Sequence, residues 1–160
     1  MKVIYHCYGS AHSSVVAAAL HLGKLPVERT PDYTEILRLE DFDVARDDSL
    51  GHLFYKGKDE SGNEIYTIGM GAETSLVKRS LLSLIEQSKV SNEEFYFAPA
   101  LPHLHRLSKI GGALSRRYGI EKIGRYLAAK GVCYCYPRMV QFVLETKAKV
   151  HEMSKMKEES

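Results

Sequence analysis

The chain has 160 residues, the usual size of one domain, with an ordinary globular balance of 44% hydrophobic and 26% charged residues. Its formal net charge of +2 gives no sign of a nucleic-acid partner, since such domains more often carry a strong basic stripe. Three cysteines do not suggest a disulfide framework, and no apolar run approaches the ~20 residues of a membrane span. We therefore expect a soluble, cytoplasmic protein with no membrane contact.

The N-terminus predicts a strand, a loop and a helix. Residues Lys2–Cys7 are rich in strand-forming residues and predict a buried first strand, with no signal peptide before it. A helix is expected over Ser13–Gly23, because one of its two leading serines can serve as the N-cap and its final glycine ends it. This helix is apolar on nearly all sides, so we expect it to lie against a sheet.

The middle of the chain predicts a short helix, a β-hairpin and a longer helix. The expected elements are a helix at Tyr33–Leu39, strands at Leu53–Lys58 and Glu64–Gly69, and a helix that ends at about Ser88. The residues between the two strands, Asp59–Asn63, are typical of a hairpin turn.

The last third predicts further strands and helices. The expected elements are a strand at Phe95–Ala100, helices at Leu107–Tyr118 and Ile120–Lys130, a strand at Val132–Tyr136 and a helix at Arg138–Val150. Strands that alternate with helices favour a mainly parallel sheet covered on both faces. We therefore predict one three-layer α/β/α domain over residues 1–150, to which the hairpin adds an antiparallel strand, followed by a charged tail over residues 151–160.

The strongest functional signal is the loop Tyr8–Ser14, which joins the first strand to the first helix. Ligands of open α/β sheets bind beyond the carboxyl ends of the strands, and a helix start offers unpaired N–H groups and a partial positive charge. The predicted phosphate-binding residues of this loop are Gly9, Ser10, Ser13 and Ser14. The competing interpretation is an ordinary strand-to-helix turn with a serine N-cap.

Two residues of this region are candidate catalytic groups. Cys7 stands near a helix start, where a thiolate nucleophile is favoured, although it also fits the last buried position of a strand. His12 is placed to give a proton or a charge near neutral pH, or else to face solvent. Arg116, after a pair of glycines, is the candidate for a charge that closes the phosphate site, and the alternative is a solvated basic helix face.

The loop matches neither of two well-known phosphate-binding motifs completely. A Walker A loop requires lysine where this chain has Val15, and a Cys-x5-Arg phosphatase loop requires arginine where it has Ser13. The loop is more similar to the phosphocysteine loop of the sugar-transport IIB proteins, in which a strand-end cysteine also precedes glycine, serines and a helix. The spacing of the glycine differs.

Several further segments carry a resemblance over nearly the whole length: Ile4–Gly9, Ala11–Ala19, His21–Gly23, Lys56–Glu64 and Thr146–Lys147. Through them the chain resembles an uncharacterised family of small proteins, a domain of unknown function, from spore-forming Gram-positive bacteria. The family resemblance leads us to expect glycine where this chain has Ser10. It implies a bacterial cytoplasmic protein and carries no known activity.

We therefore expect a phosphorylated small molecule or nucleotide to bind at the loop, with phosphoryl transfer or hydrolysis as the reaction if the protein is an enzyme. The sequence names no cofactor. One alternative is a non-enzymatic regulatory protein, a homodimer, with Tyr8 and His12 at its interface. Another is a thiol redox or metal protein that uses Cys7, or Cys133 and Cys135, the latter pair with His103-x-His105 as a zinc site.

Overall fold

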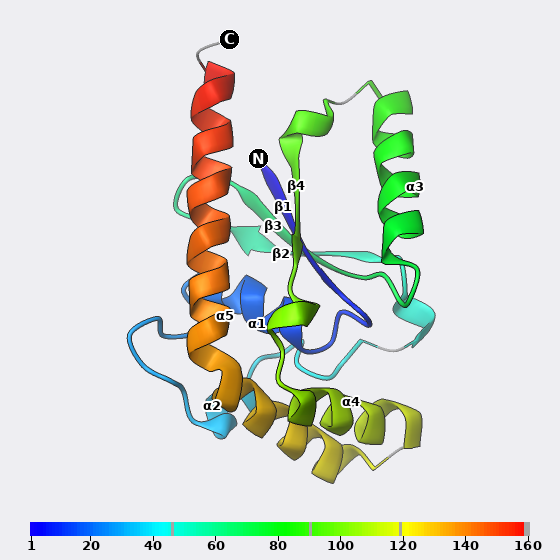
Figure 1. The fold of residues 1–160 in the computed structure, drawn as a ribbon, viewed down its shortest axis with the longest axis vertical. Helices are drawn as coiled ribbons and strands as arrows, with labels where there is room; N and C mark the ends of the chain where they lie inside the picture. The colour runs from blue at the N-terminus through cyan, green and yellow to red at the C-terminus, as the bar shows by residue number, and fades with distance from the viewer. Residues whose placement is uncertain (46, 90, 119, 159–160) are drawn as a thin grey trace.

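The chain alternates strands and helices in the computed structural model, which describes residues 1–45, 47–89, 91–118 and 120–158 (Figure 1). The strands are β1 (Lys2–Cys7), β2 (Leu53–Lys58), β3 (Glu64–Gly69) and β4 (Phe95–Pro99). The α-helices are α1 (Ser13–His21), α2 (Tyr33–Leu37), α3 (Thr74–Gln87), α4 (Arg106–Tyr118) and α5 (Glu121–Glu158). Short 3-10 turns are η1 (Asp47–Ser49), η2 (Asn92–Glu94) and η3 (Leu101–His103).

The strands form a mixed four-stranded sheet in the order β2-β3-β1-β4. β1 pairs in parallel with both β3 and β4, whereas β2 and β3 form an antiparallel hairpin. This arrangement confirms the mainly parallel sheet with a hairpin that the sequence predicts. Because three strands are parallel, the ends of β1, β3 and β4 at Cys7, Gly69 and Pro99 meet at one edge of the sheet.

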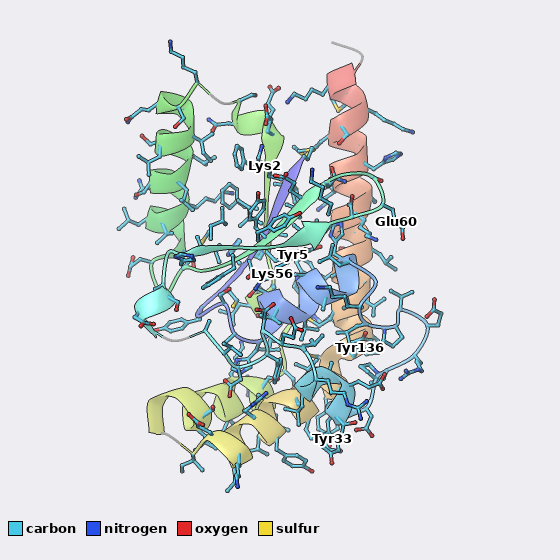
Figure 2. The ribbon with its side chains drawn as sticks, turned by 180° about the vertical axis from the view of Figure 1, so that it is seen from behind. Lys2, Tyr5, Tyr33, Lys56, Glu60 and Tyr136 are labelled. Carbon is cyan, nitrogen blue, oxygen red and sulfur yellow. The ribbon has the colours of Figure 1, made fainter. Side chains whose placement is uncertain are left out.

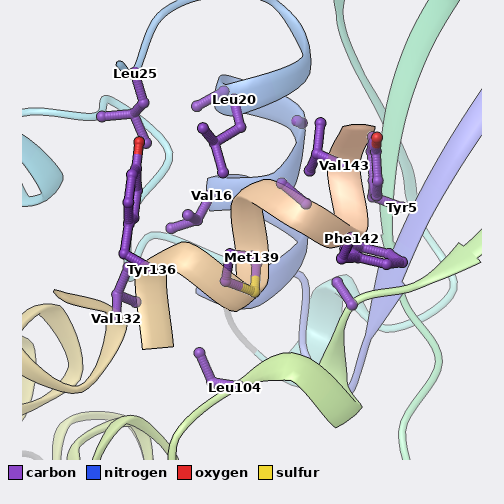
Figure 3. Close-up of a cluster of buried hydrophobic side chains, with 14 of the residues drawn as sticks. Tyr5, Val16, Leu20, Leu25, Leu104, Val132, Tyr136, Met139, Phe142 and Val143 are labelled. Atoms are coloured by element: carbon purple, nitrogen blue, oxygen red, sulfur yellow. The ribbon is translucent and has the colours of Figure 1, made fainter. Parts of the chain in front are cut away.

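Helices cover both faces of the sheet, and Figure 1 shows α3 and α5 on opposite sides of it. Val3 and Tyr5 point into the main core, which they share with α1 and α5 (Figure 3). Other members of this core are Val16, Leu20, Met139, Phe142 and Val143. Ile4, one residue along, points to the other face, against Val77 and Leu81 of α3. α3 has no fully buried residue, so its contact with the sheet is the weaker one.

Aromatic side chains fasten α2 and the segment before it to α5. The Tyr136 hydroxyl donates to the carbonyl oxygen of Pro26 at 2.7 Å. The ring of Tyr33 meets that of Tyr126 edge-on, with 5.2 Å between the ring centres, and the Lys130 ammonium lies 4.5 Å from the centre of the Tyr33 ring. Figure 2 shows Tyr33 and Tyr136 at the same end of the molecule, below Tyr5.

The last helix departs from the sequence prediction. α5 is continuous from Glu121 to Glu158, so the predicted strand Val132–Tyr136 is wrong, and the helices predicted on either side of it are parts of one helix. The segment is rich in strand-forming residues and lies between Gly131 and Pro137, which are typical element boundaries. Burial at helical spacing continues across the proline, at Val132, Cys135, Tyr136, Met139, Phe142 and Val143.

The helical state of this segment changes the expectation for two cysteines. Cys133 Sγ donates to the Pro31 carbonyl oxygen (3.4 Å), whereas Cys135 Sγ donates to the Gly131 carbonyl oxygen within α5 (3.3 Å). The two thiols therefore do not share the face that a strand would give them. Pro137 removes one backbone N–H from α5, which changes direction between its part beside α4 and its part along the sheet (Figure 1).

α5 extends through most of the predicted charged tail, since residues 151–158 are helical. No helix in the described ranges is both long and apolar enough to cross a membrane.

α4 packs against the start of α5 with the two backbones in contact. A Cβ atom on Gly111 would collide with the backbone of Ala128, and one on Gly124 would collide with the backbone of Ser115. The Ser108 hydroxyl donates to the Ala128 carbonyl oxygen across the same interface. These contacts fix the position of α4 relative to α5.

Candidate functional site

A cleft of about 580 Å³ opens beyond the carboxyl end of β1. Its first side is the loop between β1 and α1, with Cys7, Tyr8, Gly9, Ala11, His12 and Ser13. Its second side comes from η3 and α4, with Leu101, Leu104, Ser108, Lys109, Gly112 and Ala113. The structure therefore brings together four of the predicted catalytic and phosphate-binding residues, Cys7, Gly9, His12 and Ser13.

The Cys7 thiol lies at the end of β1 and is 7% exposed. Its sulfur accepts a hydrogen bond from the backbone N–H of Ser10 at 3.2 Å, and the hydroxyl oxygen of Ser14 lies 3.1 Å away. Two donors are thus available to a sulfur that also lies close to the N-terminus of α1, an arrangement suited to holding a thiolate. Both interpretations of Cys7 agree with the geometry, because the side chain is largely buried and also lines the cleft.

The Ser10 side chain does not line the cleft but holds the loop on β3. Its hydroxyl donates to Thr67 Oγ1 at 3.0 Å. Ser10 also has a φ of 53°, in the left-handed region that favours glycine, and this accounts for the glycine expected here from the family resemblance. The N–H groups of Met70 and Gly71 donate to the carbonyl oxygens of Cys7 and Tyr8, which ties the loop to the residues after β3.

The serines at the start of α1 do not cap the helix. The N-cap residue is His12, and it makes no side-chain capping bond, so the predicted serine N-cap is wrong. Ser14 faces the Cys7 sulfur instead. The Ser13 hydroxyl is buried in a residue that is 1% exposed, and it has no hydrogen-bond partner in the described part of the chain.

Backbone donors of the same loop are also unpaired. Among the described residues, none accepts a hydrogen bond from the N–H groups of Gly9, Ala11, His12 or Ser13. A buried donor left unsatisfied costs about 1–3 kcal/mol, and few such groups occur in native proteins without a reason. These donors, together with the Ser13 hydroxyl, could hydrogen-bond to an anion in the cleft.

His12 is held by a carboxylate that the sequence did not single out. Its Nε2 donates to Asp43 Oδ1 at 2.9 Å, and the Ser115 hydroxyl donates to Asp43 Oδ2 at 2.5 Å. Burial alone would raise the pKa of Asp43, but the hydrogen bonds from His12 and Ser115 outweigh it and hold that pKa below its ordinary value. Because Nε2 carries the proton shared with Asp43, Nδ1 is the ring nitrogen free to act on a ligand.

A glycine of α4 makes room for this ring. A Cβ atom on Gly112 would lie 2.7 Å from His12 Cε1, so any larger residue would push the imidazole aside. Phe42 packs edge-on against the same ring, with 5.1 Å between the centres. His12 is therefore 8% exposed and held between α4 and the segment before Asp43, and it is not the solvent-facing loop residue of the alternative interpretation.

Lys109 gives the cleft a positive charge that the sequence analysis did not assign. It is exposed, lines the cleft from α4, and forms no ion pair with any described residue. The side chain of Arg116, the cation expected from the sequence, lies outside what the structure describes, so its role stays a prediction.

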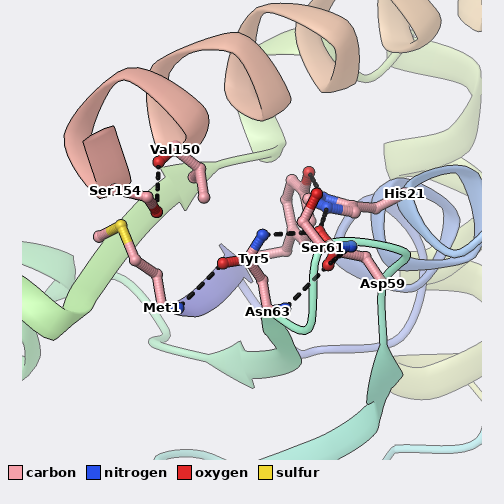
Figure 4. A network of polar contacts seen from close by, with 8 residues as sticks. All are labelled: Met1, Tyr5, His21, Asp59, Ser61, Asn63, Val150 and Ser154. Carbon is pink, nitrogen blue, oxygen red and sulfur yellow. Dashed lines mark hydrogen bonds and ion pairs between the residues drawn. The ribbon is translucent and has the colours of Figure 1, made fainter. Parts of the chain in front are cut away.

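A second buried polar network lies at the hairpin turn (Figure 4). The Tyr5 hydroxyl lies 2.8 Å from His21 Nδ1, and His21 Nε2 lies 2.9 Å from Asp59 Oδ2. Asp59 also accepts from the backbone N–H groups of Ser61 and Asn63, which favours the hairpin turn. The turn connects β2 to the start of β3, so this network lies at the other edge of the sheet from Cys7 and joins α1 to the hairpin.

The zinc site considered from the sequence is not assembled. Within the described ranges, no group of three or more His, Cys, Asp or Glu side chains is placed to hold a metal ion. The ring of His103 stacks on that of Phe142, and the ring of His105 lies beside that of Tyr134.

The family described as a protein of unknown function (DUF3189) matches residues 2–148 of the chain. This match agrees with the domain of unknown function expected from the sequence, whereas the expected source in spore-forming Gram-positive bacteria stays a prediction. Searches of curated proteins and of solved structures found no match.

Proposed function

The chain belongs to the DUF3189 family, and because that description assigns no activity, we propose from the site itself that the protein binds the phosphate group of a small phosphorylated molecule in the cleft beside Tyr8–Ser14. The observation that carries this proposal is the set of unpaired donors on one side of the cleft, above all the buried Ser13 hydroxyl. Phosphate oxygens are acceptors of the kind that these donors lack.

The electrostatics of the cleft favour the same ligand. The N-terminus of α1 supplies a partial positive charge, and Lys109 supplies a full one. Asp43, the carboxylate that binds His12, accepts hydrogen bonds from His12 and Ser115, and its side chain is only 1% exposed. An anion in the cleft would therefore contact hydrogen-bond donors, the positive end of α1 and the Lys109 ammonium group.

Binding can be tested by calorimetric titration of the full chain with inorganic phosphate. Ser13→Ala removes the unpaired hydroxyl and no existing hydrogen bond, so we expect a folding stability equal to or higher than that of the wild type and a phosphate affinity lower by roughly 3- to 10-fold. Ser83→Ala, on the exposed side of α3, is the matched control and should bind as the wild type does. If no anion binds to the wild type, the proposal fails, and the alternative of a non-enzymatic homodimeric protein is favoured.

We further propose phosphoryl transfer through Cys7 as the chemistry of the site. The thiolate would attack phosphorus, so that an S–P bond forms as the ester P–O bond breaks, and protonated His12 would give its Nδ1 proton to the departing alkoxide. Water would then cleave the S–P bond, with its proton passing to His12. The sulfur already faces two donors, from Ser10 and Ser14, which would hold it as a thiolate between the two steps.

The chemistry is tested separately from binding. Incubation with phenyl phosphate should release phenol and leave a transient phosphoryl group on Cys7, which mass spectrometry after acid-free quenching can detect. Cys7→Ser should keep phosphate binding and lose turnover. Phenol release by Cys7→Ser at the wild-type rate would refute the role of the thiol and leave the binding proposal intact.

A further inference from the structure

We infer that the ligand of this cleft is a phosphate monoester whose organic group is apolar and aromatic. This inference rests on the proposed function, because it concerns the part of the cleft that a phosphate group at the loop would leave empty. Three properties of the cleft support it: its volume, the residues that line it and its charge.

The space exceeds what a phosphate ion needs. A volume of about 580 Å³ falls in the range of ~300–1,000 Å³ that is typical of sites for whole small molecules. The unpaired donors are confined to the loop side, at Gly9, Ala11, His12 and Ser13. A ligand with its phosphate at the loop therefore places its organic group against η3 and α4.

The walls on that side offer apolar surface and few free polar groups. Leu101, Leu104 and Ala113 line it, and Tyr8, 51% exposed, adds an aromatic ring to the cleft from the start of the loop. Ser108 also lines the cleft, but its hydroxyl proton is already donated to the Ala128 carbonyl oxygen. An aromatic ring would gain from leaving water here, whereas the hydroxyls of a sugar would lose hydrogen bonds to water without replacement.

The charge of the cleft matches one phosphate group. Among the described lining residues, Lys109 carries the only permanent positive charge, and His12 adds a second when it is protonated. A phosphate monoester carries up to two negative charges, whereas a nucleoside triphosphate would bring about twice as many. The site therefore favours a monophosphate.

The test compares four ligands by calorimetric titration of the full chain: phenyl phosphate, inorganic phosphate, glucose 6-phosphate and ATP. We expect phenyl phosphate to bind at least 10-fold more tightly than each of the other three. Tyr8→Ser should reduce that preference several-fold and leave the affinity for inorganic phosphate unchanged. Tyr134→Ser, at a 70% exposed position that does not line the cleft, is the matched control.

A second pair of variants tests the charge. Lys109→Met should weaken phenyl phosphate and inorganic phosphate by the same factor, about 5- to 20-fold, whereas Lys122→Met, an exposed lysine of α5, should weaken neither. An aryl phosphate has two sources, a free metabolite or a phosphotyrosine side chain. A short phosphotyrosine peptide that binds more tightly than phenyl phosphate indicates the side chain, and one that binds more weakly indicates the free ester.

The outcomes separate this inference from the proposed function. If inorganic phosphate binds and glucose 6-phosphate or ATP matches phenyl phosphate, the ligand class is overturned and phosphate binding stands. If phosphate binds and Tyr8→Ser leaves the preference for phenyl phosphate intact, the aromatic wall is not what selects the ligand, and the inference fails. If none of the four ligands binds, both proposals fail together.

Discussion

Asp43 determines how His12 is presented to the cleft. Its two carboxylate oxygens take hydrogen bonds from residues that lie 31 and 72 positions away in the chain, His12 and Ser115. It also has a positive φ of 63°, and its backbone N–H donates to the Ala11 carbonyl oxygen at 2.9 Å. One residue thus joins the loop, α4 and the segment after α2, and it leaves Nδ1 of the imidazole free.

Asp43→Asn should therefore weaken both the fold and the site. The pKa of Asp43 is lowered in the folded state, so its carboxylate contributes stability above the ordinary pKa of 3.8, and this contribution is lost as the pH falls through the folded value. We expect the variant to lose about 1–3 kcal/mol of unfolding free energy at pH 7, measured by urea denaturation. The difference in unfolding free energy between the variant and the wild type should become smaller below pH 3.8.

The exposed Asp48 provides the matched control, and Asp48→Asn should change the stability by less than about 0.5 kcal/mol. If Asp43→Asn is as stable as Asp48→Asn at pH 7, the carboxylate does not hold His12 in the way described.

At the scale of elements, α4 depends on glycines that let it touch other parts of the fold. Gly111 faces the backbone of Ala128 in α5, whereas Gly112 faces the His12 ring. The structure gives each glycine its own neighbour, one in the helix interface and one in the cleft.

Gly111→Ala should destabilise the protein even though alanine is the better helix former. The gain in helix propensity is about 1 kcal/mol, but the new methyl group meets backbone atoms of α5 that cannot move independently. We expect a net loss of about 1–3 kcal/mol of unfolding free energy, measured by urea denaturation. Lys109→Ala, at an exposed position of the same helix, is the control for stability, and a Gly111→Ala protein as stable as this control would contradict the close packing.

The elements that the sequence predicted well are those whose signals are local. β1, β2 and β3 begin and end at the predicted residues, because turn residues and loops bound short apolar runs. α5 was missed because residues 132–136 favour a strand locally, whereas Val132, Cys135 and Tyr136 are buried in the main core at helical spacing. The loop for which we propose phosphate binding was located from the sequence because its strand, loop and helix are adjacent. Asp43, Lys109 and Ser115 come from distant segments that no local pattern connects.

At the scale of the whole molecule, the elements that form the cleft are well packed, whereas α3, which does not line it, is the least buried helix contact of the sheet. Its loop side continues β1, whose Val3 and Tyr5 are fully buried, and its other side is α4, which is held by α5. α3 lies on the opposite face of the sheet and buries none of its residues completely. A ligand in the cleft would therefore bridge the loop and α4 without touching α3.

Amide hydrogen exchange can test whether a ligand contacts the loop and α4 but not α3. Saturating phosphate should slow exchange in residues 8–14, because the N–H groups of Gly9, Ala11, His12 and Ser13 would gain acceptors. It should also slow exchange in α4, whose Lys109 would contact the same anion, and it should leave α3 unchanged. Ser13→Ala at the same phosphate concentration should show less protection in both segments. Protection spread evenly over α3, α4 and the loop would indicate general stabilisation of the fold by the ion, and would contradict a site at the loop.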